Sequence, residues 1–305
     1  MEAEILRAFS SVQHQVEETT GGVIIGQTTF EDHYLPLISN YIDGQSTKKG
    51  PYIIGFQGCQ GIGKTTLTTL IEHVLVELDF HVVRCSIDDY YSSITERLAL
   101  AEQHPGNPFY QISRGMPGTH RLRELFKMLE AAREGRRLEL PKFDKSLHQG
   151  SGDILDQVTV VEGRQDFIIL EGWCVNIPSY NSEQFLESIS RNEYVTDIFI
   201  SLDPDRIYYQ VVLEYLVEYQ GIWEQFDNRT RMLGEDIRWI ASWRVEQEER
   251  MKAVKGEGMS EGQIHEFVKP YIPFTWLYYD RESRIKADCE LVIGEDHLPR
   301  SLNIH

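Results

Sequence analysis

The sequence predicts an α/β protein with a mainly parallel β-sheet and helices on both faces. Three observations lead to this fold class. Short apolar runs typical of strands alternate along the chain with segments of helical periodicity. A glycine-rich loop lies between the first such run and a helix, and acidic residues directly follow two further runs. Ligands of open α/β sheets bind beyond the carboxyl ends of the strands, so these three strand ends predict one shared site.

The glycine-rich loop is the most specific motif. Its residues, Gly-Cys-Gln-Gly-Ile-Gly-Lys-Thr at 58–65, match the pattern G-x-x-x-x-G-K-[ST] completely. The run 52–56 reads as a buried strand before it, and apolar residues from Leu67 to Leu78 recur at helical spacing behind it. Glycines let backbone N–H groups turn toward phosphate oxygens, and the helix N-terminus adds partial positive charge. The alternative is a chance glycine turn before a helix.

The loop therefore predicts a nucleoside triphosphate site, with ATP and Mg²⁺ as expected ligands. We expect Lys64 to reach the β- and γ-phosphates and Thr65 to bind Mg²⁺ through its hydroxyl. The residues expected to hold the nucleotide are Gly58, Cys59, Gln60, Gly61, Ile62, Gly63, Lys64, Thr65 and Thr66.

The other elements follow in order along one predicted domain, residues 1–305. Residues 1–50 read as a helical N-terminal extension. Strands are expected at 52–56, 81–87, 167–170, 197–202 and 290–293, and a helix at 244–255. Between the second and third strands lies a long insertion, 90–166, and long segments of that kind are usually functional. Residues 223–270 form a predicted, mainly helical region.

Acidic residues at two strand ends suit phosphoryl transfer. Asp88 and Asp89 follow the second strand, and Glu171 closes the third. The reaction needs a carboxylate that accepts the proton of the attacking hydroxyl, and oxygen ligands for the metal. Asp88 or Asp89 suits the base, and Glu171 suits the metal or its bound water. The alternative for Asp88 and Asp89 is a pair that caps a helix.

Composition excludes several classes of partner. The chain has 30 Lys and Arg against 48 Asp and Glu, a formal net charge of −18, so nucleic acid is not expected to bind. We find no apolar run of membrane-spanning length and no basic targeting segment, and therefore expect a cytoplasmic protein that does not bind membranes. The four cysteines lie far apart and fit reduced thiols.

An ordered series of motifs resembles the D-glycerate 3-kinases. These kinases belong to the P-loop kinase group that includes uridine kinase, phosphoribulokinase and bacterial pantothenate kinase. The resemblance spans about residues 34–279. The matching segments are 86–91 (Ser-Ile-Asp-Asp-Tyr-Tyr), 114–120 (Arg-Gly-Met-Pro-Gly-Thr-His), 140–146 (Leu-Pro-Lys-Phe-Asp-Lys-Ser), 171–173 (Glu-Gly-Trp), 243–248 (Trp-Arg-Val-Glu-Gln-Glu) and 258–268.

The resemblance implies roles for individual residues. Asp88 matches the catalytic base. The resemblance also implies that the region 223–270 contains a lid, in which Arg244 matches an arginine that stabilises the transferring phosphoryl group. Residues of the insertion match the motifs that line the acceptor pocket: Arg114, His120, Lys142, Asp144 and Lys145. An anionic acceptor needs nearby cations, and Arg114, His120, Lys142 and Lys145 could supply them. The alternatives are surface charges on a long loop and, for Arg244, an ordinary i,i+4 pair with Glu248.

The chain also departs from the family pattern near the acceptor and lid. Arg121 replaces an expected Asp, Ile154 replaces an Arg, and residues 174–177 replace a Gly-Phe pair. Residues 228–232, Asn-Arg-Thr-Arg-Met, look too polar for the buried strand expected there. These changes leave the phosphate loop intact, so donor chemistry is a firmer prediction than acceptor identity.

The leading hypothesis is an ATP-dependent kinase that phosphorylates a hydroxyl of a small anionic hydroxy acid, D-glycerate. One alternative is a kinase for another small alcohol, such as pantothenate or a nucleoside. Another is a non-catalytic regulator that binds ATP; the joint presence of Lys64, Asp88 and Glu171 argues against it, because binding alone needs no base. A GTPase is disfavoured, since the chain has no Asn-Lys-x-Asp motif.

Overall fold

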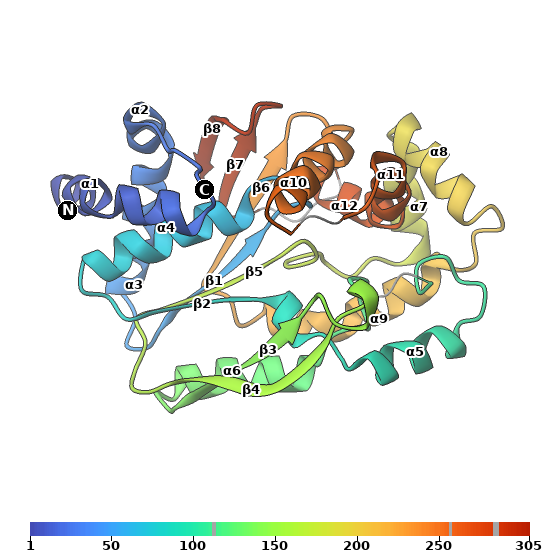
Figure 1. Cartoon of the computed structure of the whole chain (residues 1–305), viewed down its shortest axis with the longest axis horizontal. Coiled ribbons are helices and arrows are strands. Elements are labelled where there is room, and N and C mark those ends of the chain that lie inside the picture. The colour runs from blue at the N-terminus through green and yellow to red at the C-terminus, as the bar shows by residue number, and fades with distance from the viewer. Residues whose placement is uncertain (112–113, 256–257, 283–286) are drawn as a thin grey trace.

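A six-stranded, mostly parallel sheet forms the centre of the molecule (Figure 1). The structure, a computed structural model, describes residues 1–111, 114–255, 258–282 and 287–305, so positions 112–113 of the predicted insertion and 256–257 of the predicted lid region lie outside the described residues. The strand order is β2-β5-β1-β6-β7-β8, and only β8 runs antiparallel to its neighbour in this sheet. The strands are β1 Tyr52–Gln57, β2 Val82–Ser86, β5 Phe167–Gly172, β6 Asn228–Gly234, β7 Cys289–Ile293 and β8 Pro299–Ile304.

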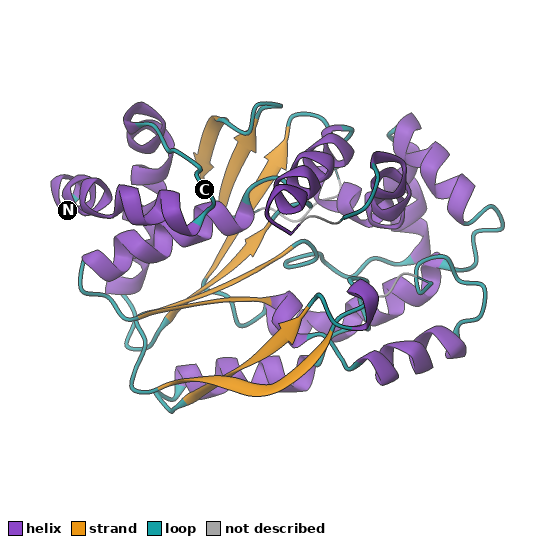
Figure 2. Cartoon of the chain, viewed as in Figure 1, coloured by secondary structure: helices purple, strands orange, loops and turns teal. Residues whose placement is uncertain are grey.

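Helices lie on both sides of this sheet (Figure 2). The predicted fold class is therefore confirmed. The α-helices are α1 Glu2–Thr19, α2 Gln27–Thr29, α3 Leu35–Ser46, α4 Lys64–Glu77, α5 Ile94–Gln103, α6 Leu122–Arg133, α7 Ser182–Ser190, α8 Glu193–Leu202, α9 Tyr209–Trp223, α10 Trp239–Lys255, α11 Glu261–Val268 and α12 Ile272–Tyr279. A π-helical turn, η1 Phe30–Tyr34, and three 3₁₀ turns, η2 Ile87–Tyr90, η3 His148–Gly150 and η4 Lys269–Tyr271, complete the described helical segments. Among the described residues, we find no helix that is long and apolar enough to cross a membrane.

The N-terminal extension is helical, as the sequence predicts, and it packs near the phosphate loop. Helix α1 buries Ile5, Phe9, Val12 and Val16, a spacing of three or four residues that places them on one helix face. The ring of Phe9 stacks on Phe30, with ring centroids 3.8 Å apart. Figure 1 shows α1 beside α4, the helix that begins at the phosphate loop. The end of α1 thereby reaches the loop that the sequence motif identified.

The long insertion contains a small antiparallel sheet of its own. Strands β3 Leu138–Asp144 and β4 Asp153–Val161 pair with each other and form a hairpin apart from the main sheet. The hairpin packs against η2, the turn that follows β2 (Figure 1). The segment that joins β3 to β4 is thereby carried to the carboxyl end of β2, where Asp88 and Asp89 lie.

Two strand predictions are wrong. Residues 197–202 belong to helix α8. The N-cap of this helix is Asn192, whose side chain accepts a hydrogen bond from Val195 N at 3.1 Å. Its buried residues Val195 and Phe199 lie four positions apart, which is a helical spacing. The continuous apolar run at 198–200 hides this spacing in the sequence and resembles a strand.

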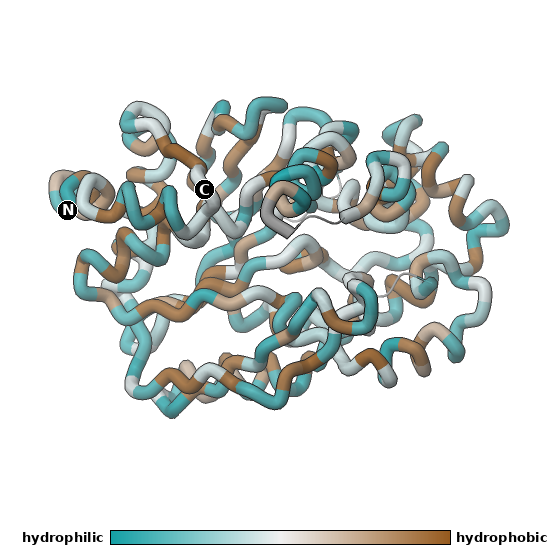
Figure 3. The backbone as a smooth tube through the Cα atoms, viewed as in Figure 1, coloured by the Kyte–Doolittle hydropathy of each residue, from teal (hydrophilic) through white to brown (hydrophobic). Residues whose placement is uncertain are grey.

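Conversely, the polar segment 228–232 is part of β6, a buried strand between β1 and β7. Its polar side chains have partners: Arg231 Nε donates to Gln57 Oε1 at 2.9 Å, and the hydroxyl groups of Thr230 and Tyr41 lie 2.5 Å apart. Burial of polar groups is tolerated where each finds a hydrogen bond. Figure 3 shows that the central strands are otherwise largely hydrophobic.

Candidate active site

The phosphate loop joins β1 to α4 in the geometry that an anion site needs. Gly61 and Gly63 have φ of +78° and +101°, the left-handed region that favours glycine. A Cβ on Gly61 would also lie 2.7 Å from the backbone of Trp243 in α10, so glycine is required there for two reasons. Helix α4 begins at Lys64, whose ammonium group donates to the carbonyl of Cys59 at 2.9 Å. The lysine is therefore folded over the loop that would bind the phosphates.

Cys59 behaves as a small packing residue within the loop. Its side chain is buried, and its sulfur lies 3.5 Å from the hydroxyl of Tyr279. Burial raises the pKa of the Cys59 thiol to about 11, so the thiol stays protonated at neutral pH.

Thr65 and Glu171 meet next to the loop. The Thr65 hydroxyl donates to Glu171 Oε1 at 2.8 Å, and Thr68 donates to Oε2 at 3.4 Å. Strands β1 and β5 are neighbours, which brings the first turn of α4 and the end of β5 together. Burial raises the pKa of Glu171, a cost that a bound cation would relieve.

A hydroxyl and a carboxylate in contact fit Mg²⁺, which prefers hard oxygen ligands. Within the described ranges, no cluster of three or more His, Cys, Asp or Glu side chains could enclose a metal ion. Mg²⁺ is usually held by one or two carboxylates together with waters and phosphates rather than by an all-protein cage. The residues present therefore fit a metal that is bound jointly with a nucleotide.

Asp88 and Asp89 have different surroundings. In the turn η2, Asp89 Oδ2 accepts from Ser86 N at 3.0 Å, and Ser86 Oγ accepts from Asp88 N at 3.2 Å, a reciprocal capping box. The capping alternative therefore holds for Asp89, whereas the Asp88 carboxylate takes no part in the cap. Instead, Asp88 Oδ1 accepts from the Tyr91 hydroxyl at 2.8 Å.

Asp88 is also paired with Lys145, from the segment after β3. The Lys145 ammonium donates to Asp88 Oδ2 at 2.6 Å. Burial alone would raise the pKa of Asp88, but the charge and hydrogen bond of Lys145 outweigh it and hold the pKa well below its usual value. Asp88 is therefore ionised at every pH at which the protein would work.

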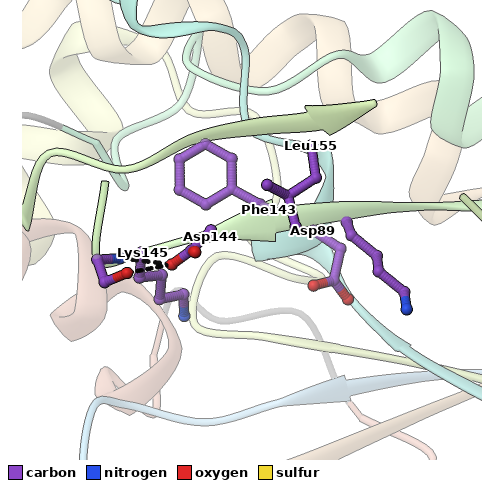
Figure 4. A pocket seen from close by; sticks show the side chains of 7 residues that line it. Asp89, Phe143, Asp144, Lys145 and Leu155 are labelled. Atoms are coloured by element: carbon purple, nitrogen blue, oxygen red, sulfur yellow. Dashed lines mark hydrogen bonds between the residues drawn. The ribbon is translucent and has the colours of Figure 1, made fainter. Parts of the chain in front are cut away.

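The hairpin carries most of the predicted acceptor residues to this place. Lys142, Asp144 and Lys145 line a cavity of about 420 Å³ together with Asp89, Phe143, Ser146 and Leu155 (Figure 4). Asp144 Oδ1 accepts from Ser146 Oγ at 2.6 Å. Arg114 donates to the carbonyl of Gly150 and lies close enough to Lys145 to lower that group's pKa, against the larger opposite effect of Asp88. Lys145 thus contacts the Asp88 carboxylate, Arg114 lies near Lys145, and Lys142 lines the same cavity as Lys145.

His120 does not supply positive charge, and this corrects the sequence-based expectation. Its side chain is buried, its Nδ1 lies 2.6 Å from the Tyr219 hydroxyl, and its ring stacks on Tyr91 with centroids 4.6 Å apart. Burial lowers the pKa of His120 to about 4, in spite of the nearby Asp88. The imidazole is therefore neutral at pH 7 in this structure, which disfavours His120 as a cation for the acceptor.

Arg244 forms the helical pair that the sequence offers as an alternative. Its guanidinium lies 2.7 Å from Glu248 Oε2 and 5.7 Å from the ring centroid of Phe267. Both charged side chains are nearly buried, with exposed fractions of 12% and 6%. The neighbouring Trp243 contacts the phosphate loop at Gly61, so Arg244 is close to the loop but is held by helix α10 in this structure.

A second cavity, of about 470 Å³, adjoins the phosphate loop. Trp243, Glu246 and Gln247 of its lining belong to the motif segment 243–248, whereas other lining residues are not indicated by the sequence. One wall comes from Lys64, Thr65 and Thr66, and the opposite walls come from the end of α1, from α10 and from the turn after β7. Those additional lining residues are Thr19, Thr20, Gly21, Val23, Trp243, Glu246, Gln247, Arg250, Met251 and His297. Outside the segment 243–248, no motif or periodicity marks these residues, because the end of α1, α10 and the turn after β7 come together only in the folded chain.

Three of the departures from the family pattern have structural roles. Arg121 Nε donates to the carbonyl of Tyr91 at 3.0 Å, which ties the start of α6 to the segment after η2. Ile154 pairs with Phe143 in the hairpin. Asn176, within the changed segment 174–177, donates to the carbonyl of Gly55 at 2.9 Å.

Comparisons with known proteins agree with this geometry. No protein-family model matches the chain. The chain is 30% identical over 273 residues to the Schizosaccharomyces pombe protein named uncharacterized kinase mug58. This alignment covers 86% of this chain and 95% of the relative. It is 28% identical over 270 residues to the chloroplastic D-glycerate 3-kinase of Arabidopsis thaliana. That alignment covers 85% of this chain and 55% of the relative. The solved structure of D-glycerate 3-kinase from Cryptococcus neoformans superposes with a TM-score of 0.80 at 23% identity, over 92% of this chain and all of that one.

Proposed function

The chain belongs to the D-glycerate 3-kinase family of P-loop kinases, and from this premise we propose that it transfers the γ-phosphoryl group of ATP to a hydroxyl of D-glycerate. It is a kinase with an alcohol as acceptor. The observation that carries the choice of an anionic acceptor is the pairing of the Asp88 carboxylate with Lys145 at 2.6 Å, close enough to Glu171 for Asp88 to raise the pKa of that group. Asp88, which would accept the proton of the acceptor's hydroxyl, therefore lies beside Lys145, which would bind the acceptor's carboxylate.

The phosphate loop and the start of α4 would hold ATP. Backbone N–H groups of residues 58–65 and the N-terminus of α4 favour phosphate oxygens. Lys64 would leave the Cys59 carbonyl for the β- and γ-phosphates, because an anion is a stronger partner for an ammonium group than a neutral carbonyl. The cavity beside Thr66 and His297 has room for the nucleoside.

Thr65 and Glu171 would hold Mg²⁺. When bound, the ion neutralises negative charge on the phosphates and orients the transferring group. The Thr65 hydroxyl and the Glu171 carboxylate already lie 2.8 Å apart. This contact supports a shared role for the two side chains.

At the acceptor end, Asp88 would take the proton of the attacking hydroxyl. Asp89 is occupied by the cap of η2, so the two neighbouring carboxylates have separate tasks. Lys142, Lys145 and Arg114 would attract and orient the carboxylate of the acceptor. Arg244 would stabilise the negative charge of the transferring phosphoryl group only if its guanidinium left Glu248 and bound a phosphate oxygen instead.

A coupled ADP-release assay tests this function. Purified protein with ATP and Mg²⁺ is offered D-glycerate, L-glycerate, pantothenate and uridine in parallel, and the product is identified by ³¹P and ¹³C NMR. We expect ADP release with D-glycerate at a kcat/KM at least tenfold above the other three acceptors, and phosphorylation at the 3-hydroxyl. A higher kcat/KM with pantothenate or uridine would refute the acceptor assignment, and ATP binding without turnover on any of the four would refute the glycerate kinase itself.

A further inference from the structure

One phenol on helix α9 holds the segment that presents His120. Tyr219 is fully buried, and its hydroxyl oxygen accepts from Gly118 N at 3.0 Å. The same hydroxyl lies 2.6 Å from Nδ1 of His120. Within the segment, Thr119 Oγ1 donates to the carbonyl of Met116 at 2.6 Å, which makes a compact turn. The position of His120 is therefore fixed from two sides.

These contacts determine which nitrogen of His120 carries the proton. The imidazole is neutral at pH 7, because burial lowers its pKa to about 4. If Nδ1 carried the proton, the Tyr219 oxygen would accept twice and its own buried hydrogen would have no acceptor among the described residues. If Tyr219 instead donates to Nδ1, both of its hydrogen bonds are satisfied and the imidazole proton lies on Nε2. The second arrangement leaves fewer buried groups without a partner.

The Nε2–H group is then a donor without a partner in the part of the chain that the structure describes. His120 is 93% buried, since only 7% of the residue is exposed. Buried polar groups rarely lack a partner, and an exception in a functional region calls for an explanation. The two ring nitrogens point to different sides of the ring, so Nε2 points away from Tyr219.

His120 lies next to the candidate base. It pairs with Tyr91 in an isolated antiparallel bridge, and the two rings stack with centroids 4.6 Å apart. Tyr91 in turn donates to Asp88 Oδ1 at 2.8 Å. The charged groups that act on His120 are Asp88, which favours its protonated form, and Arg97, which opposes it.

We propose that Tyr219 is a positioning residue that keeps the proton of His120 on Nε2, and that this N–H donates a hydrogen bond to an oxygen atom of the acceptor. The identity of the acceptor rests on the proposed function; the tautomer and the role of Tyr219 do not. A neutral donor suits this position, because it can bind a hydroxyl or carboxylate oxygen without competing with Lys145 for Asp88.

Histidine-selective ¹⁵N NMR tests the tautomer without any substrate. We expect the wild-type spectrum to show His120 as the Nε2–H form at pH 7, and Tyr219→Phe to show a mixture of both forms. Tyr215→Phe is the matched control, since Tyr215 lies one turn earlier on α9 and its ring packs on Gly118. An Nδ1–H form in the wild type, or an unchanged spectrum in Tyr219→Phe, overturns the proposal.

Kinetics test the consequence for the acceptor. Loss of one oriented hydrogen bond corresponds to roughly a tenfold change, so Tyr219→Phe should lower kcat/KM for the acceptor about tenfold and leave KM for ATP unchanged. Tyr215→Phe should change neither. His120→Gln places an amide N–H near the Nε2 position and should retain more activity than His120→Asn, whose amide lies near Nδ1. Equal loss in both His120 variants, with melting temperatures near that of the wild type, contradicts the donor role.

A titration separates this inference from the proposed function. Addition of D-glycerate to the labelled protein should shift the Nε2 resonance of His120. If only a different hydroxy acid shifts it, the proposed acceptor is wrong and the role of His120 stands. If the active acceptor, identified by ADP release, leaves the resonance unchanged, His120 does not bind it.

Discussion

Replacement of Asp88 by Asn is the sharpest test of the proposed base. The amide keeps the shape of the side chain and can still accept the hydrogen bond of Tyr91, which lies at 2.8 Å in the wild type. It has no basic lone pair, and it removes the charge that faces Lys145 at 2.6 Å. The perturbation is thus confined to proton transfer and to one ion pair.

The expected loss is large in rate and small in stability. General-base assistance is typically worth about 10²–10⁴ in rate, or roughly 3–5 kcal/mol of activation free energy. The Lys145 side chain is 54% exposed, so its pair with Asp88 should add no more than about 1 kcal/mol to the free energy of unfolding. We therefore expect kcat to fall by two to four orders of magnitude with little change in melting temperature.

Coupled ADP release measures kcat with both substrates saturating, and isothermal titration calorimetry measures the Kd of ATP. The Kd should change little, since the phosphate loop is untouched. Asp89→Asn is the matched control: it perturbs the cap of η2 and should cost a few tenths to about 1 kcal/mol of stability and much less kcat. Near wild-type kcat in Asp88→Asn together with a collapse in Asp89→Asn would reverse the assignment.

Three further predictions address the donor, the acceptor and the loop backbone. Lys64→Ala should abolish turnover, since the charge expected on the β- and γ-phosphates is lost; turnover equal to the wild type would show that this loop is not the nucleotide site. Lys145→Met should raise KM for the acceptor and move the acidic limb of the kcat/KM profile to higher pH, because Lys145 no longer lowers the pKa of Asp88; a limb at the wild-type pH would argue against Asp88 as the group that titrates. Gly61→Ala should lower the melting temperature and remove the stabilisation by ATP, because Gly61 has a φ of +78° and the added carbon would lie 2.7 Å from the backbone of Trp243. Gly262→Ala on α11 is the control: its added carbon meets no atom within 4 Å, so it should be neutral or mildly stabilising.

The sequence predicted those parts of the fold and site that local chain chemistry determines. The phosphate loop, the strand before it and helix α4 depend on contiguous residues, and the acids after β2 and β5 depend on where two strands end. The sequence does not predict β6 as a buried strand, because the partners of its polar side chains are remote in the chain: Arg231 bonds Gln57 of β1, and Thr230 bonds Tyr41 of α3. Polarity predicts exposure only where such partners are absent.

The charge state of His120 could not be predicted for a related reason. A histidine after Gly-Thr in a loop of basic residues suggests a cation, but its state depends on burial and on Tyr219, which lies 99 positions later in the chain. The separate tasks of Asp88 and Asp89 also depend on geometry, since Ser86 selects one neighbour for the cap. Sequence patterns name the chemical groups, whereas packing sets their protonation and partners.

A base with a strongly lowered pKa is consistent with this site once the acceptor is considered. Without the acceptor, Lys145 has Asp88 as its partner, and the carboxylate is ionised but weakly basic. The carboxylate of a bound hydroxy acid would share the charge of Lys145, and Lys142 and Arg114 lie close by to bind it as well. The pull of Lys145 on Asp88 would then weaken, and the pKa of Asp88 would rise toward the value that burial alone favours. An acceptor without a carboxylate would leave Asp88 paired with Lys145 and less basic. The ion pair would therefore give acids a higher kcat than neutral alcohols.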